Sequence, residues 1–132
     1  MLVALKLTDD AGRVVSENFY WRGKDAASYR ALNKLAQAPL ELSASAPKVD
    51  GSDRVVNVTL SNRGRTPALN AKLTLVDDRG GRILPAFYSD NYVALLPGES
   101  KTITVRYPSS VNAPPSLRLR GWNVAPAEVK AM

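Results

Sequence analysis

The segment that decides the fold is residues 55–61, which read VVNVTLS. Val56, Val58 and Leu60 alternate there with polar side chains. Because successive side chains of a β-strand point to opposite faces, this alternation predicts an antiparallel strand with one face in a core and the other in water. The same alternation recurs in four further segments: residues 40–46, 69–75, 101–107 and 117–122.

Short strands separated by turn residues account for most of the chain. They predict an all-β fold, an immunoglobulin-like antiparallel β-sandwich of seven to nine strands with one short helix. Residues 2–21 predict a β-hairpin. Residues 25–37 predict the helix, which Asp25 can cap and which Pro39 stops.

The length of 132 residues suits one domain, and no second core of useful size fits beside it. We therefore expect a single immunoglobulin-like sandwich over residues 1–124 and a flexible C-terminal tail over residues 125–132. The chain has no cysteine, so no disulfide can staple the two sheets and the core must rest on apolar packing.

The absence of histidine and cysteine also limits the kinds of catalytic and metal-binding site that the chain can form. Histidine is the usual general base near neutral pH, and both residues are common metal ligands and members of nucleophilic triads. We therefore expect no catalytic residue, no metal site and no cofactor in this chain. The paired carboxylates Asp9–Asp10 and Asp77–Asp78 lie in expected turns, where adjacent side chains point different ways and stay solvated, so we expect them to have a structural role.

The formal net charge of +6 raises the question of nucleic acid. The basic residues are spread singly along the chain, which is typical of a solvated surface, so we expect no nucleic-acid partner. No apolar run is long enough to cross a bilayer, and we expect no membrane partner. The first residues lack the basic and apolar regions of a signal peptide.

Aromatic and amide side chains gather in two short stretches, SENFYW at residues 16–21 and YSDNYV at residues 88–93. Aromatic rings beside planar polar groups can bind sugars, but they also fill cores and domain interfaces, and we favour packing. The candidates for contact with a sugar or with a neighbouring domain are Asn18, Tyr20, Trp21, Tyr88, Asp90, Asn91 and Tyr92.

These two stretches, with ALLPGES at residues 94–100 and GWN at residues 121–123, carry a family resemblance over nearly the whole chain. The chain resembles the C-terminal immunoglobulin-like domain of the exo-β-glucosaminidase and β-mannosidase enzymes of glycoside hydrolase family two. The resemblance implies a multidomain parent whose catalytic carboxylates lie on a separate TIM barrel and hydrolyse β-linked glucosamine or mannose with retention. Val93 departs from the pattern, where a phenylalanine is expected.

The resemblance implies that this chain is a non-catalytic accessory domain, with the catalytic barrel of its parent as partner. An autonomous carbohydrate-binding module, with an oligosaccharide as partner, remains an alternative, as does a bacterial adhesion-type immunoglobulin-like module. A domain of charge +6 repels polycationic chitosan at long range, which favours docking over independent chitosan binding. We expect a secreted or periplasmic parent of bacterial type.

Overall fold

The computed structural model describes residues 1–132. The chain forms two compact units, Met1–Leu35 and Ala36–Met132. The expected single sandwich over residues 1–124 differs from this division, because the sandwich strands all lie in the second unit. A two-stranded hairpin has a strand's alternation without a facing sheet, so the pattern of residues 2–21 alone could not assign it to a core.

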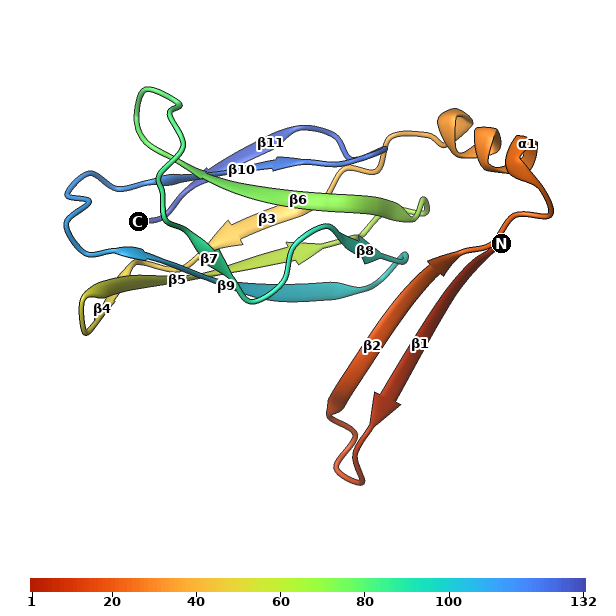
Figure 1. Ribbon diagram of the computed structural model, residues 1–132, viewed down its shortest axis with the longest axis horizontal. Helices are drawn as coiled ribbons and strands as arrows, with labels where there is room; N and C mark the ends of the chain where they lie inside the picture. The colour runs from red at the N-terminus through yellow and green to blue at the C-terminus, as the bar shows by residue number, and fades with distance from the viewer. The chain divides into compact units, whose positions relative to one another are not determined.

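The first unit contains the expected hairpin. Strands β1 (Leu2–Thr8) and β2 (Val14–Trp21) pair antiparallel (Figure 1). At the turn, Asp9 Oδ1 accepts hydrogen bonds from the backbone N–H groups of Ala11 and Arg13. Gly12 has φ 76°, a left-handed conformation that glycine adopts without strain.

The helix that follows is shorter than the sequence predicts. It consists of α1 (Ala26–Tyr29) and a 3₁₀ turn, η1 (Arg30–Lys34). Asp25 caps α1 as expected: its Oδ1 accepts from the Ser28 backbone N–H, and the Ser28 hydroxyl accepts from the Asp25 backbone N–H. With so few residues and no buried side chain, the segment has little packing to extend it toward residue 37.

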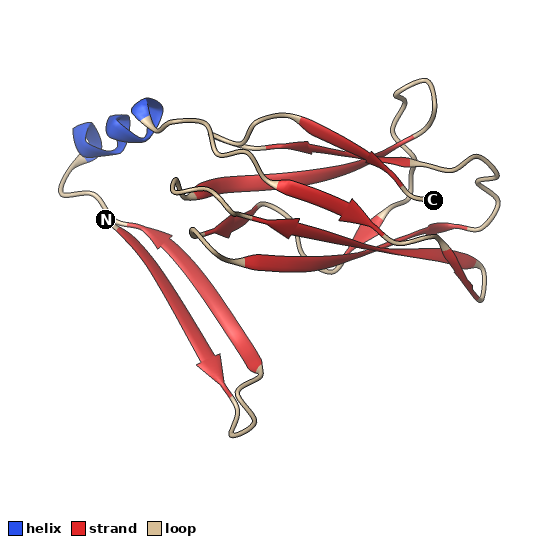
Figure 2. Ribbon diagram, turned by 180° about the vertical axis from the view of Figure 1, so that it is seen from behind, coloured by secondary structure: helices blue, strands red, loops and turns tan.

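The second unit is a β-sandwich whose two sheets face each other, as Figures 1 and 2 show. One sheet has the strand order β11-β10-β6-β8, and the other has the order β3-β5-β9-β7 with β4 also paired to β5. The strands are β3 (Glu41–Ala44), β4 (Lys48–Asp50), β5 (Asp53–Ser61), β6 (Ala68–Val76), β7 (Phe87–Tyr88), β8 (Val93–Leu95), β9 (Ser100–Pro108), β10 (Ser116–Arg120) and β11 (Ala127–Lys130). The all-β immunoglobulin-like prediction is confirmed.

The core lies between the two sheets and uses the predicted alternation. Val56, Val58 and Leu60 of β5 are each 0% exposed, whereas Asn57 between them is exposed. Facing side chains from β6, β9 and β10 complete the core, and the largest of them are Leu73, Leu75, Ile103, Tyr107, Leu117 and Leu119. Apolar burial of this kind supplies most of the stabilisation of a domain without disulfides.

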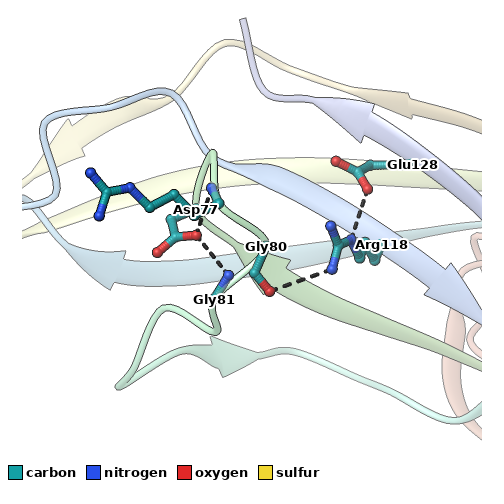
Figure 3. Close-up of polar contacts among 6 residues, drawn as sticks. Asp77, Gly80, Gly81, Arg118 and Glu128 are labelled. Atoms are coloured by element: carbon teal, nitrogen blue, oxygen red, sulfur yellow. Dashed lines mark hydrogen bonds and ion pairs between the residues drawn. The ribbon is translucent and has the colours of Figure 1, made fainter.

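The C-terminal residues are ordered, unlike the expected flexible tail over residues 125–132. Strand β11 pairs with β10, and Ala131 is 0% exposed. Arg118 of β10 fastens this edge: its Nε donates to Glu128 Oε2 of β11 at 2.8 Å, and its Nη1 reaches the Gly80 carbonyl oxygen at 3.4 Å (Figure 3). A four-residue strand is too short for its alternation to stand out in the sequence.

The buried phenol of Tyr107 is expected to make the sandwich less stable at alkaline pH. Burial raises the pKa of its phenol above the ordinary value of 10.0, and the charge of Arg54 offsets part of this rise. The folded state therefore holds the phenol proton more tightly than the unfolded chain does. This contribution to the free energy of unfolding is fully present below about pH 10 and is lost as the pH rises through the raised pKa. We expect urea unfolding measured from about pH 8 to about pH 11 to show a smaller alkaline loss of stability in Tyr107→Phe than in the wild type. Equal losses in both proteins would contradict this assignment.

Candidate functional site

The candidate site is a shallow recess of about 250 Å³ on the sandwich unit. Its floor is β6, and its wall is the segment that leads through β7 to β8. The lining includes Lys72 and Arg82 together with three of the predicted contact residues, Tyr88, Asn91 and Tyr92. The structure therefore brings these three candidates together around one hollow.

The polar ends of two of these side chains are bound to the β6 backbone. Asn91 Oδ1 accepts from the Leu73 N–H at 2.8 Å, and Asn91 Nδ2 donates to the Leu73 carbonyl at 3.0 Å. The Tyr88 hydroxyl accepts from the Leu75 N–H at 2.8 Å. Because β8 pairs with β6 only from Ala68 to Ala71, these side chains extend the hydrogen bonding along the same edge of β6, where the Ile83 N–H also donates to the Leu75 carbonyl oxygen.

Of these three side chains, Tyr92 is the one that faces solvent. It is 59% exposed, has φ 56°, and its ring lies 5.2 Å from the Lys72 ammonium, within cation–π range. Asp90, two residues earlier in the chain, forms an ion pair with Lys101, with Oδ2 and Nζ 2.6 Å apart. The recess thus combines an exposed ring with basic groups and has no carboxylate in its lining.

The other three predicted contact residues, Asn18, Tyr20 and Trp21, lie in β2 of the first unit. Asn18 and Tyr20 are exposed, and Trp21 is half-buried. The Trp21 carbonyl oxygen accepts a hydrogen bond from the Tyr29 hydroxyl at 3.3 Å. Asn18 and Tyr20 lie on one face of β2 and Trp21 lies on the other, and all three belong to a different unit from the recess.

Two buried asparagines, which the sequence analysis did not select as site residues, form several hydrogen bonds to the backbone. Asn62 is 1% exposed, and its Nδ2 donates to the carbonyl oxygens of Thr66 and Leu95. Asn123 is 6% exposed, and its side chain makes three hydrogen bonds to backbone groups of distant segments. No local sequence signal identifies these two residues, because their burial and hydrogen bonds depend on segments that are distant in the chain.

The carboxylates of the turns have structural partners. The Arg13 backbone N–H, followed by the Arg13 guanidinium, lowers the pKa of Asp9, which favours the ionised form. Asp77 Oδ1 accepts from the backbone N–H groups of Arg79 and Gly81 in the turn after β6 (Figure 3).

No cluster of three or more histidine, cysteine, aspartate or glutamate side chains could hold a metal ion. No helix is long and apolar enough to cross a membrane.

Replacing Tyr88 by phenylalanine tests whether the hydroxyl holds the wall of the recess to β6. We expect Tyr88→Phe to lower the free energy of unfolding by about 1–2 kcal/mol, because the Leu75 N–H loses its partner. Tyr107→Phe is the matched control: the buried Tyr107 hydroxyl has no hydrogen-bond partner, so its removal should not lower the free energy of unfolding at neutral pH. Urea denaturation compares the two variants, and equal losses would contradict this role of Tyr88.

Residues 18–124 match a family model described as the exo-β-D-glucosaminidase Ig-fold domain. The chain belongs to this family. It is 36% identical over 98% of its length to the exo-β-D-glucosaminidase of Streptomyces avermitilis, and 34% identical over 95% of its length to that of Amycolatopsis orientalis. A mannosylglycoprotein endo-β-mannosidase of Lilium longiflorum is 48% identical, over 32% of the chain. The family resemblance inferred from the motifs is confirmed.

Solved structures support the same membership. The crystal structure of Amycolatopsis orientalis exo-chitosanase CsxA matches 98% of this chain with a TM-score of 0.90 and 31% identity. The match covers 18% of that chain, and the two curated glucosaminidases are covered to 17% and 14%. The chain therefore spans about one sixth of the length of the relatives that it matches.

Proposed function

We propose that this chain is a non-catalytic accessory domain of a multidomain exo-acting glycoside hydrolase, an exo-β-glucosaminidase, and that it packs against the catalytic barrel and borders its active site. The observation that carries the proposal is the match of nearly the whole chain to a small part of much longer exo-β-D-glucosaminidases. The matches to curated glucosaminidases extend over most of the chain, whereas the mannosidase match extends over 42 residues. Glucosamine is therefore favoured over mannose as the sugar of the parent.

The surface of the sandwich supports docking against another domain. Leu84, Phe87 and Tyr92, all in the segment between β6 and β8, are 72%, 65% and 59% exposed. Large exposed apolar side chains gathered in one segment are typical of interaction surfaces. Basic Lys72 and Arg82 lie beside them in the recess and suit an acidic partner surface, as expected for an enzyme that must attract a cationic sugar.

The same geometry argues against an autonomous carbohydrate-binding module. Sugar recognition needs polar groups free to bind hydroxyls, whereas Asn91 and Tyr88 use theirs on the β6 backbone. The basic recess also repels protonated glucosamine. The adhesion-type alternative gains no support from the family match, which is to domains of enzymes.

Amide chemical shifts distinguish docking from sugar binding. We expect glucosamine and mannose oligosaccharides at millimolar concentration to cause no saturable shifts in the labelled chain. Localised, saturable shifts around Trp21, Asp90 and Tyr92 in the wild type, lost in Tyr92→Ala, would overturn the proposal and establish a binding module.

Complementation in trans tests the docking itself. The Streptomyces avermitilis relative is prepared without the segment that matches residues 1–132, and hydrolysis of a chromogenic β-glucosaminide is assayed with and without the purified chain. We expect the chain alone to have no activity and to raise the activity of the truncated enzyme. The Leu84→Asp and Phe87→Asp variants should restore less activity than the wild type, and Val49→Asp, at a 71% exposed position of β4, is the control.

A further inference from the structure

Asp50 and Gly51 form the only Asp–Gly step in the chain, and it lies in the turn between β4 and β5. Asp50 pairs directly with Asp53, so Gly51 and Ser52 are the two residues of the hairpin loop. Gly51 has φ 61°, the positive value that a two-residue turn of type II′ places at its first position. The geometry of the turn therefore favours glycine directly after this aspartate.

An aspartate followed by glycine can react with its own backbone. The Gly51 nitrogen attacks Asp50 Cγ, a new C–N bond closes a five-membered succinimide, and the hydroxyl of the protonated carboxyl leaves with the amide proton as water. A second water molecule then opens the ring. Opening at Cγ restores aspartate, whereas opening at the backbone carbonyl gives isoaspartate, whose main chain runs through Cβ and Cγ. The two steps release and consume one water each and need no oxidant or cofactor.

The turn leaves the attacking nitrogen and the carboxyl accessible. The space that a Cβ of residue 51 would fill has no heavy atom within 4 Å. The Gly51 N–H makes no hydrogen bond within the protein, and the Asp50 side chain is 58% exposed. Neither ring closure nor the entry of water is therefore blocked by neighbouring atoms.

Arg106 of β9 restrains the carboxylate. Its Nη2 donates to Asp50 Oδ2, and its Nη1 lies 3.7 Å from Asp53 Oδ2. Asp50 and Asp53 lie directly opposite each other, where like charges repel, and the guanidinium that contacts both offsets this repulsion. Ring closure needs the protonated carboxyl and expels one of its oxygens, so the ion pair has to break first.

We propose that Asp50–Gly51 is a site of spontaneous isoaspartate formation in the folded chain, and that the ion pair with Arg106 slows the reaction. Ion pairs at a solvated surface contribute little free energy, so this pair slows ring closure without preventing it. Isoaspartate adds one methylene to the main chain beside a two-residue turn, which then cannot keep Asp50 opposite Asp53. Strand β4 therefore detaches from β5 in the product.

Ageing of the purified 132-residue chain at physiological temperature and slightly acidic pH tests the site. Isoaspartate is quantified by methyl transfer from S-adenosylmethionine with an isoaspartyl methyltransferase, and electron-transfer fragmentation of the tryptic peptide of residues 49–54 locates it. We expect isoaspartate at residue 50 and none at Asp53, which arginine follows in the same peptide. No isoaspartate at residue 50, or equal amounts at both positions, would overturn the proposal.

Three variants test the chemistry and the restraint. Asp50→Glu keeps the charge but would have to close a less favourable six-membered ring, so the product should disappear. Arg106→Ala should form isoaspartate about threefold faster, which corresponds to about 0.6 kcal/mol, as expected of an exposed ion pair. Arg63→Ala is the matched control, because it removes an arginine whose partner, Glu41, is also exposed and lies away from this turn. Equal rates in the two arginine variants would overturn the role of Arg106.

Should Arg106→Ala not fold, concentrated sodium chloride is added to the wild type instead. Salt screens the exposed pair, so the rate should rise, and an unchanged rate would overturn the restraint. Hydrogen exchange of the aged chain tests the structural consequence. We expect a fast-exchanging population of β4 amides equal to the isoaspartate fraction, with β6 and β10 as in the fresh protein. Unchanged β4 exchange in aged protein that contains isoaspartate would contradict the detachment of β4.

Discussion

Asn123→Ala is expected to lower the free energy of unfolding of the sandwich by about 3 kcal/mol. The Asn123 side chain accepts from the Leu69 N–H at 2.9 Å and donates to the carbonyl oxygens of Pro67 at 2.8 Å and Ala36 at 3.0 Å. Alanine would leave these backbone groups without their partner at a site where little water can replace it.

Urea denaturation of the wild type and the variant measures this loss. Asn112→Ala is the matched control, because Asn112 is exposed in the loop between β9 and β10 and should change stability by less than about 0.5 kcal/mol. A loss for Asn123→Ala no larger than that of Asn112→Ala would show that the three hydrogen bonds contribute nothing net.

The sandwich could be predicted because its strands are encoded locally. The alternation of Val56, Val58 and Leu60 depends only on neighbouring residues, and the structure places all three in the core. The role of Asn123 could not be predicted in the same way, since its partners Ala36 and Pro67 are 87 and 56 residues away in the chain. A contact of that kind exists only once the topology is known.

The candidate site also combines features that are encoded locally with features that depend on distant parts of the chain. The sequence analysis named Tyr88, Asn91 and Tyr92 as candidate contact residues, and the structure places all three around one recess because they are neighbours in one loop. It could not show that the Asn91 amide and the Tyr88 hydroxyl complete the hydrogen bonding of β6, which depends on where β8 ends. Asn91 and Tyr88, whose side chains are of types that suit a sugar site, therefore form hydrogen bonds with the edge of β6. Tyr92 is the member of the three that faces solvent.

The hairpin illustrates a limit of pattern reading itself. Residues 2–21 have the alternation of a sandwich strand pair, and the structure forms that pair. Alternation says that one face is to be buried, and it does not say which domain buries it. This is why the sequence suggested one domain over residues 1–124, whereas the structure separates Met1–Leu35 from Ala36–Met132.

Leu60→Ala is the second substitution with a large expected effect. Leu60 lies in β5 at 0% exposure, paired with Lys101 of β9 on one side and Leu42 of β3 on the other. Truncating a buried leucine removes its transfer free energy and leaves a cavity, so the free energy of unfolding should fall by about 2–5 kcal/mol. The value should lie in the upper part of this range, because β5 is hydrogen-bonded along both edges and cannot easily move to fill the cavity.

Leu84→Ala is the matched control for this change, because the same atoms are removed from a side chain that is 72% exposed. Its effect on urea unfolding should be within about 0.5 kcal/mol of zero. Leu84 also belongs to the proposed docking surface, so Leu84→Ala should weaken complementation of the truncated relative while leaving the fold intact. A loss of stability as large as that of Leu60→Ala would mean that Leu84 packs within this chain, and it would remove Leu84 from the docking surface.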